Sequence, residues 1–172
     1  MFRFENTHTH RSHFSLLISH IAYLCAMHIL ILNGPNLNLL GKRETNVYGS
    51  VSFEVYLEEL KKKFSSVKIM YEQSNVEGEL INVLHRHGLK DSKVKTDAII
   101  INPGGYSHTS VAMADALATM VVPVIEVHIS NIHAREEYRH HTITGAKCLG
   151  IISGFGLSSY AMAIEFLINK PK

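Results

Sequence analysis

Residues 126–139 gather an acid, imidazoles, a hydroxyl, amides and guanidinium groups directly after an apolar run, residues 121–127. A buried strand that ends in so many polar groups is costly unless those groups bind something. Histidine exchanges protons near neutral pH and arginine suits carboxylates, so these residue types favour acid–base chemistry on a polar anion. Taken alone, the stretch fits equally well a strand end followed by a solvated helix start.

Two earlier loops are also rich in polar groups that a core would exclude. Each of the three loops follows a predicted strand, and ligands of open α/β sheets bind outside the carboxyl ends of the strands. We therefore expect the three loops to converge on one site. Their polar residues are, in chain order, Asn33, Asn36, Asn38, Arg43 and Tyr48, then Asn102, Ser107, His108 and Thr109, then His128, Ser130, Asn131, Arg135 and Arg139.

Short apolar runs rich in β-branched residues alternate with helical spacings from Met27 onward. The runs predict strands over residues 28–32, 67–71, 98–101, 122–127 and 149–152. Helical patterns cover residues 53–64, 77–88, 110–120, a short stretch from 134, and 158–167. Ser52 is a predicted helix cap, and Ser74 with Glu77 has the spacing of a capping box. This alternation predicts a flavodoxin-like α/β domain with a five-stranded parallel sheet and helices on both faces.

Bulk composition restricts the classes of function. A chain of 172 residues that is 46% hydrophobic suits one globular domain. The net charge of +2 is nearly balanced, which argues against a long nucleic-acid groove. Cys25 and Cys148 form no disulfide framework and match no zinc spacing, so a reducing cytoplasm is the expected location.

The first 26 residues differ from the rest, with His8, His10 and His13 among small polar residues and then a mostly apolar stretch. Polar residues interrupt that stretch, and it ends in a poor signal-peptidase site. It is too short and too polar to span a bilayer, so no membrane partner is expected. We interpret residues 1–26 as an extension, and residues 27–172 as the functional domain.

Named cofactor and metal motifs are absent from the polar loops. Residues 34–43 have too long a spacing for a P-loop, and residues 150–156 lack the dinucleotide fingerprint. Ser107 and His108 are adjacent and have no nucleophile elbow around them. His128 and His133 lack the spacing of a helical zinc pair. The residues therefore require no metal, nucleotide or flavin.

Three ordered blocks of sequence resemble a known family. The blocks are residues 31–49, which include the run Asn33-Gly34-Pro35-Asn36, residues 101–110, and residues 126–139. Each is similar to a block of the type II 3-dehydroquinate dehydratases, and the likeness extends from residue 27 to about residue 167. The resemblance implies loss of water from 3-dehydroquinate to give 3-dehydroshikimate in the shikimate pathway. It also implies a flavodoxin-like fold, no cofactor, and a homododecamer that is a tetramer of trimers.

The resemblance assigns five residues to catalysis. Tyr48 matches the base that removes a proton beside the substrate ketone. Free tyrosine has a pKa of about 10 and burial raises it, so a fixed positive charge must oppose burial, and Arg43 matches the residue that supplies it. Asn36 matches the residue that holds a water against the enolate oxygen. His128 matches the acid that protonates the leaving hydroxyl, and Glu126, on the same side of the strand, would orient its ring.

The remaining matches are substrate-binding groups. The resemblance implies that Asn102, Ser130 and the backbone N–H of Ile129 take the substrate carboxylate, and that ring hydroxyls go to His108 and Arg139. Gly105 belongs to the same binding set, and Asp115 matches a residue that reaches a neighbouring subunit's site. Residues 40–48 resemble a lid. Arg135 either supports the lid or pairs with Glu136 on the surface.

Other functions remain as alternatives. A flavodoxin-like module that senses an anionic metabolite would use Arg139, Asn102 and Ser130 but would leave Tyr48 without a role. An FMN or nucleotide carrier would need a phosphate loop, which is absent. A Schiff-base enzyme of the unrelated type I would need a buried lysine, whereas Lys147 has the sequence context of a surface residue.

Overall fold

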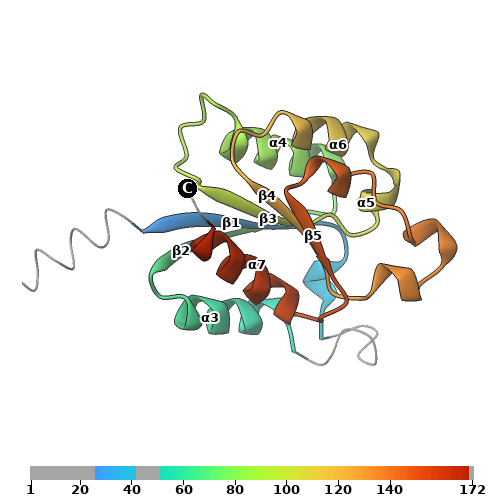
Figure 1. The fold of residues 1–172 in the computed structure, drawn as a ribbon, viewed down its shortest axis with the longest axis horizontal. Coiled ribbons are helices and arrows are strands. Elements are labelled where there is room, and N and C mark those ends of the chain that lie inside the picture. Colours follow the sequence, from blue (N-terminus) through green and yellow to red (C-terminus); the bar gives the residue numbers. More distant parts are fainter. Residues whose placement is uncertain (1–25, 42–50, 171–172) are drawn as a thin grey trace, which may run out of the picture.

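A computed structural model describes residues 26–41 and 51–170 (Figure 1). Its centre is a sheet of five parallel strands in the order β2-β1-β3-β4-β5, which is the flavodoxin-like order. The strands are β1 Met27–Asn33, β2 Val67–Gln73, β3 Ala98–Asn102, β4 Val124–His128 and β5 Gly150–Ser153. The predicted fold class and the predicted number of strands in the sheet are therefore confirmed.

Helices cover both faces of the sheet (Figure 1). One face packs against α3 Phe53–Lys63 and α7 Ser158–Asn169, and the other against α4 Glu77–Gly88 and α6 Val111–Ala118. The shorter elements are α5 Tyr106–Thr109 and the 3-10 turns η1 Leu37–Leu39, η2 Ile132–Ala134, η3 Glu137–Arg139 and η4 Gly145–Lys147.

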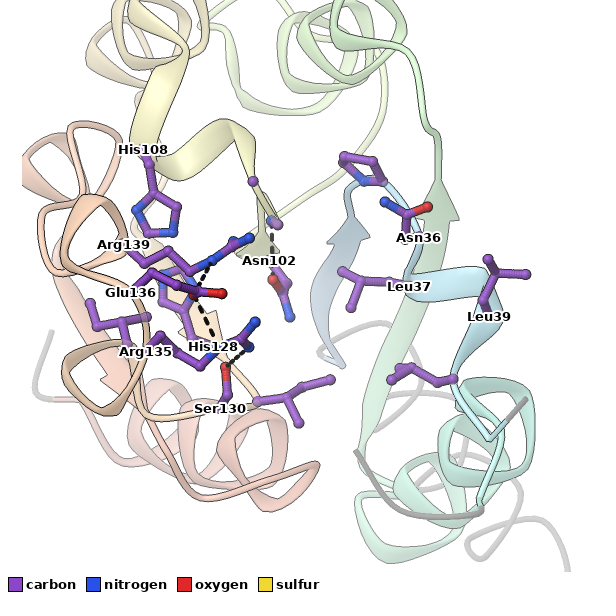
Figure 2. Close-up of a pocket in the computed structure, with 16 residues that line it drawn as sticks. Asn36, Leu37, Leu39, Asn102, His108, His128, Ser130, Arg135, Glu136 and Arg139 are labelled. Atoms are coloured by element: carbon purple, nitrogen blue, oxygen red, sulfur yellow. Dashed lines mark hydrogen bonds and ion pairs between the residues drawn. The ribbon is translucent and has the colours of Figure 1, made fainter. Parts of the chain in front are cut away.

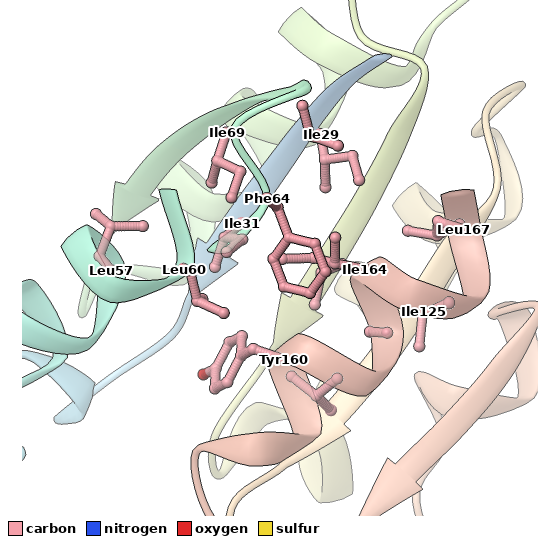
Figure 3. Close-up of a cluster of buried hydrophobic side chains, with 14 of the residues drawn as sticks. Ile29, Ile31, Leu57, Leu60, Phe64, Ile69, Ile125, Tyr160, Ile164 and Leu167 are labelled. Carbon is pink, nitrogen blue, oxygen red and sulfur yellow. The ribbon is translucent and has the colours of Figure 1, made fainter. Parts of the chain in front are cut away.

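The two-residue period of the strands decides which side chains reach which face. In β1, Ile29 and Ile31 join the core under α3 and α7, whereas Leu30 and Leu32 join the core under α4 and α6. Figure 3 shows the first of these cores, where Tyr160 of α7 lies among apolar side chains of the sheet and of α3. Strands buried on both faces explain why the sequence of each central strand is continuously apolar.

One predicted helix cap, Ser52, is confirmed and the predicted capping box at Ser74 is wrong, while Ser110 is a cap that the sequence analysis did not single out. The Ser52 hydroxyl accepts from the Val55 N–H at 3.4 Å, and the Ser110 hydroxyl caps α6 through the Met113 N–H at 2.8 Å. Ser74 forms no capping box with Glu77, because its hydroxyl donates to Glu79 and accepts from the Val76 N–H. Helix α4 consequently begins after Val76.

The helix predicted from Ala134 is also wrong. The segment forms two 3-10 turns, η2 and η3, separated by Arg135 in an extended conformation with φ −109° and ψ −170°. The Asn131 side chain accepts from the His133 N–H, which favours one tight turn over a continuing helix.

Strand β1 begins at Met27, the residue at which the predicted domain starts. The predicted extension, residues 1–26, lies outside the described residues except for Ala26, so it remains a prediction. Among the described residues, no helix is long and apolar enough to cross a bilayer.

Candidate active site

The cavity lies outside the carboxyl ends of β1, β3 and β4, where the strand order reverses between β1 and β3 (Figure 2). Its volume is about 330 Å³, which suits a small molecule. It is lined by Pro35, Asn36, Leu37, Leu39, Leu40, Asn102, Gly104, Gly105, His108, His128, Ile129, Ser130, Ile132, Arg135, Glu136 and Arg139. All three predicted loops contribute, so the expectation that they converge is confirmed.

The turns after β1 and β3 interlock to form one wall. The Gly34 N–H donates to the Asn102 carbonyl at 2.7 Å, and a Cβ on Gly34 would lie 2.6 Å from the Pro103 carbonyl oxygen. Gly104, at φ 60°, packs against Pro35 from the other turn. Because backbone approaches backbone here, a side chain at residue 34 would push the two loops apart.

His128 and Glu126 form a buried polar pair behind the cavity. Both lie on β4 two residues apart, so their side chains point to the same face, and Glu126 is fully buried. The His128 Nε2 lies 2.7 Å from Glu126 Oε1. A carboxylate can only accept, so Nε2 carries a hydrogen, and Nδ1 is left to exchange a proton.

His108, at the end of α5, stacks beside His128 with ring centroids 6.2 Å apart and an interplanar angle of 19°. Its Nδ1 lies 2.8 Å from the His141 carbonyl, which fixes the hydrogen on Nδ1 and leaves Nε2 as an acceptor. Burial lowers the pKa of His108 below its usual value of about 6.5, and the nearby charges of His128 and Arg139 lower it further. His108 is therefore neutral at physiological pH.

Two arginines share one carboxylate at the mouth of the cavity. The Glu136 Oε2 lies 2.9 Å from Arg139 Nε and 3.5 Å from Arg135 Nε. The Glu136 pKa is lowered by a hydrogen bond from its own backbone N–H, and by these two arginines. Arg135 also donates to the Ser130 hydroxyl at 3.3 Å. Two cations against one anion leave a positive mouth that favours an anionic ligand.

Asn102 is held from below by a buried network on the α3/α7 side of the sheet. Its Nδ2 donates to the Tyr160 hydroxyl at 3.0 Å, and that hydroxyl donates to Asn33 Oδ1 at 2.8 Å. Its Oδ1 accepts from the Gly104 N–H at 3.2 Å. These contacts fix the amide orientation and leave one N–H of Nδ2 for a ligand.

Among the described residues, no group of three or more His, Cys, Asp or Glu side chains could hold a metal ion. The arrangement can still exchange a proton through His128, accept a hydroxyl proton at His108, and bind an anion beside the arginines.

Comparison with known proteins settles the family. The model of the family described as "Dehydroquinase class II" matches residues 27–168. The chain belongs to the class II dehydroquinases. The match covers the whole described sheet and every described residue that lines the cavity.

Curated relatives of this class II dehydroquinase bear the name 3-dehydroquinate dehydratase. One from Caldicellulosiruptor bescii is 51% identical over 141 residues, covering 81% of this chain and 94% of the relative. One from Exiguobacterium is 48% identical over 144 residues, covering 83% and 95%.

Two solved structures are similar to the fold described above. The type II dehydroquinase from Butyrivibrio crossotus aligns with a TM-score of 0.78 at 43% identity, covering 84% of this chain and 99% of that one. The enzyme from Propionibacterium acnes aligns with a TM-score of 0.75 at 38% identity, covering 83% and 97%.

Predicted site residues differ in where the structure places them. Asn36, Asn102, Gly105, His108, His128, Ile129, Ser130 and Arg139 line the cavity, and Glu126 lies behind His128. Asp115 is exposed on α6 and does not line this cavity, so its reach to a neighbouring subunit remains a prediction. Arg43 and Tyr48 lie outside the described residues, and so does most of the predicted lid.

Sequence reasoning missed several residues of the site. Leu37, Leu40 and Ile132 are buried apolar residues that line the cavity, and no local pattern distinguishes them from core. Thr142 and Thr144 donate to Glu126, although they follow it by 16 and 18 positions. Arg135, left open between two roles, contacts both Ser130 and Glu136.

Proposed function

We propose that this class II dehydroquinase converts 3-dehydroquinate into 3-dehydroshikimate and water, as the name of its relatives indicates. The observation that carries the proposal is the His128–Glu126 pair, which presents a histidine nitrogen to a cavity with a positive mouth. This is the chemistry that an elimination needs at its leaving hydroxyl.

The reaction removes one proton and one hydroxide from a β-hydroxy ketone. A base takes the proton beside the ketone, and the electron pair moves to the carbonyl oxygen to give an enolate. When the enolate collapses, the carbon–oxygen bond at the β position breaks, and the departing oxygen takes a proton to leave as water. No electron is lost or gained, so the reaction needs no redox partner.

The first step belongs to Tyr48, which Arg43 keeps ionised, and Asn36 holds a water against the enolate oxygen. The described part of the chain supports the role of Asn36 by its position, because it lines the cavity with φ 67°. Asparagine tolerates this left-handed conformation, and the Asn36 N–H donates to Asn75 Oδ1 at 3.0 Å. Stabilising an oxyanion with one donor is worth roughly 3–4 kcal/mol.

The second step belongs to His128. With Nε2 directed at Glu126, the ring gives the Nδ1 proton of its charged form to the leaving hydroxyl. The buried carboxylate supports the positive charge that the ring carries before the transfer.

The binding roles follow the positions of the polar groups around the cavity. Asn102, Ser130 and the Ile129 backbone take the substrate carboxylate, and His108 and Arg139 take ring hydroxyls. Gly105 closes the floor without a side chain, and Asp115 completes the site of a neighbouring subunit. The arginine-rich mouth supports binding of a carboxylate.

The assembled enzyme is a homododecamer, a tetramer of trimers, and it works in the cytoplasm. The exposure of Asp115 supports assembly, since its proposed role requires a second chain.

The test is an absorbance assay for the conjugated enone of the product, with 3-dehydroquinate as substrate. We expect turnover by the full chain, and loss of turnover with retained ligand binding in Tyr48→Phe. Retained turnover in Tyr48→Phe would contradict the assignment of the base. Binding without turnover by the unaltered chain would indicate the metabolite-sensing alternative.

A second measurement separates this mechanism from the Schiff-base route. Borohydride with substrate traps an enzyme that forms an imine on a lysine. We expect no covalent adduct by mass spectrometry, and Lys147 is exposed rather than buried. An adduct on any lysine would overturn the proposal.

A further inference from the structure

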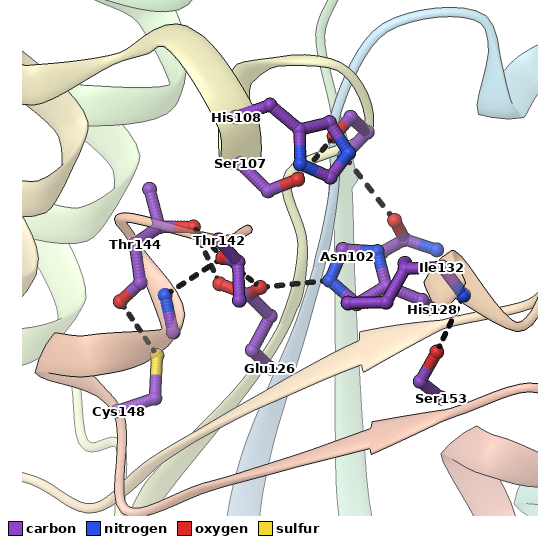
Figure 4. A network of polar contacts seen from close by, with 12 residues as sticks. Asn102, Ser107, His108, Glu126, His128, Ile132, Thr142, Thr144, Cys148 and Ser153 are labelled. Carbon is purple, nitrogen blue, oxygen red and sulfur yellow. Dashed lines mark hydrogen bonds and ion pairs between the residues drawn. The ribbon is translucent and has the colours of Figure 1, made fainter. Parts of the chain in front are cut away.

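The Glu126 carboxylate is surrounded by side-chain hydrogen-bond donors behind the cavity (Figure 4). Its Oε1 accepts from His128 Nε2 and from the Thr142 hydroxyl, both at 2.7 Å, and its Oε2 accepts from the Thr144 hydroxyl at 2.5 Å. Both oxygens of a fully buried acid are therefore engaged. Without such donors, nothing would offset the free energy of desolvating this buried carboxylate.

The two donors from Thr142 and Thr144 are neutral hydroxyl groups. A hydroxyl orients a carboxylate without cancelling its charge, so the charge stays available to the His128 ring. The Thr142 hydroxyl itself accepts from the Gly145 N–H at 3.0 Å, which directs its own hydrogen toward Glu126. Thr144 is fully buried, so its hydroxyl has no water to compete for it.

The same few residues also hold the second histidine. The His141 carbonyl accepts from His108 Nδ1 at 2.8 Å, and the Ile143 N–H donates to the Ser107 carbonyl at 2.9 Å. Residues 141–144 are thus tied to α5 by their backbone and to β4 by their side chains. This segment therefore contacts both histidines: it reaches His128 through the Glu126 carboxylate and it binds His108 directly through the His141 carbonyl.

We propose that residues 141–144 form a positioning segment that sets the proton-bearing nitrogen of both pocket histidines. Thr142 and Thr144 act through Glu126 on His128, and the His141 carbonyl acts on His108. The inference rests on the proposed function for the reaction it serves, and it adds Thr142 and Thr144 as positioning residues for the acid.

In this arrangement His128 can lose and regain its Nδ1 proton in each catalytic cycle without a change of tautomer. The neutral ring keeps its hydrogen on Nε2, so a proton lost from Nδ1 to the leaving hydroxyl is replaced at the same atom. His108, held the other way round, offers Nε2 as an acceptor throughout. When His128 carries the transferable proton, its Nδ1–H is a donor while His108 Nε2 is an acceptor, so the two stacked rings then present opposite hydrogen-bonding character to one substrate.

The charged and titratable groups around His128 are few in the described chain. Glu126 lies on the same strand, His108 faces it from α5, and Arg135, Glu136 and Arg139 line the same cavity. Cys148 lies behind Glu126, but burial raises the pKa of its thiol to about 12, so it adds no charge. The Thr142 and Thr144 hydroxyls are therefore the neutral donors that orient the Glu126 carboxylate.

The experiment compares Thr144→Val, which keeps the shape and removes the hydroxyl, with Thr144→Ser, which keeps the hydroxyl. We expect Thr144→Val to lower kcat about 10- to 100-fold, the range of loss known for removal of the hydrogen-bond partners behind metal-ligating histidines. KM should stay within about threefold, the acidic limb of the kcat profile should move, and Thr144→Ser should restore both.

Thr119→Val is the matched control. Thr119 is an exposed threonine whose hydroxyl donates to the Ala116 carbonyl at 2.8 Å at the end of α6. Its replacement should leave kcat and its pH profile unchanged. Equal losses of kcat in Thr119→Val and Thr144→Val would mean that the effect is structural, and would overturn the proposal.

Nitrogen-15 NMR of labelled histidines provides a readout independent of turnover. In the unaltered protein we expect neutral His128 with its hydrogen on Nε2 and neutral His108 with its hydrogen on Nδ1. The opposite tautomer on either ring would overturn the proposal, even if Thr144→Val failed to fold. If the unaltered protein made no enone, the proposed function would fail, whereas these tautomers would still decide the role of residues 141–144.

Discussion

His108 illustrates how a single residue acquires its state from its surroundings. Burial is the largest influence on its pKa and lowers it, and electrostatic interactions with His128 and Arg139 act in the same direction. The His141 carbonyl and Glu126 oppose them and do not prevail. The residue therefore serves as a neutral acceptor rather than as a cation.

This state makes stability depend on pH. The folded pKa of His108 lies below the unfolded value of about 6.5, so the unfolded chain binds the proton more readily. Its contribution to stability is complete above pH 6.5 and is lost as pH falls through the folded pKa. Urea unfolding between pH 7.5 and 5.5 should therefore show a loss of stability that is smaller in His108→Asn.

His133 is the control for that measurement. It is exposed at η2, and His133→Asn should leave the pH dependence of unfolding unchanged. A His108→Asn variant with the same pH slope as the unaltered protein would show that His108 does not titrate as described.

The turns after β1 and β3 show how elements, rather than single residues, shape the cavity. Backbone atoms of the two turns come close enough that residue 34 has no room for a side chain. The contact joins the loop that carries Asn36 to the loop that carries Asn102 and His108. Loops held this way keep binding groups in place before the ligand arrives.

Gly34→Ala should therefore destabilise the protein and weaken substrate binding together. The added Cβ would meet the Pro103 carbonyl oxygen at 2.6 Å, and overpacking of this kind costs about 1–3 kcal/mol. Gly78→Ala is the control, because nothing lies within 4 Å of its Cβ on the exposed side of α4. That change should stabilise by up to about 1 kcal/mol. Denaturant unfolding and KM measure both, and an unchanged KM in Gly34→Ala would contradict the role of the interlocked turns.

At the scale of the whole molecule, one edge of the sheet carries an apolar surface. Strand β5 is one of the two edge strands of the described sheet, and Ile151, Phe155 and Met162 line a shallow depression beside it with exposed fractions of 43%, 60% and 40%. Apolar patches beside an open sheet edge favour contact with another chain. The proposed homododecamer gives such a surface a partner.

Phe155→Asp should consequently reduce the assembled mass in light scattering. A charge placed at a buried contact costs several kcal/mol, which is enough to dissociate a subunit at micromolar concentration. Val55→Asp on α3, where the side chain is 56% exposed, should leave the mass unchanged. An unaltered assembly in Phe155→Asp would place the subunit contacts elsewhere on the molecule.

The family, the fold class and the convergence of three loops were predictable from the sequence, and all three are confirmed. Local patterns carried that information, because buried strands are continuously apolar and polar groups stand at their ends. Where the predictions were wrong, the competing contact was also local. Ser74 turned to Glu79, and Asn131 favoured a tight turn over the predicted helix.

What only the tertiary structure decided is how distant groups hold the reacting ones. Thr142 and Thr144 reach Glu126 across 16 and 18 positions, and Tyr160 bonds Asn33 across 127. The sequence alone determined that a histidine and an acid share one face of a strand, because side chains two residues apart always do. The sequence could not determine which hydroxyls donate to Glu126. Packing of the sheet against its loops selects these partners, and that packing produces no regular spacing in the sequence.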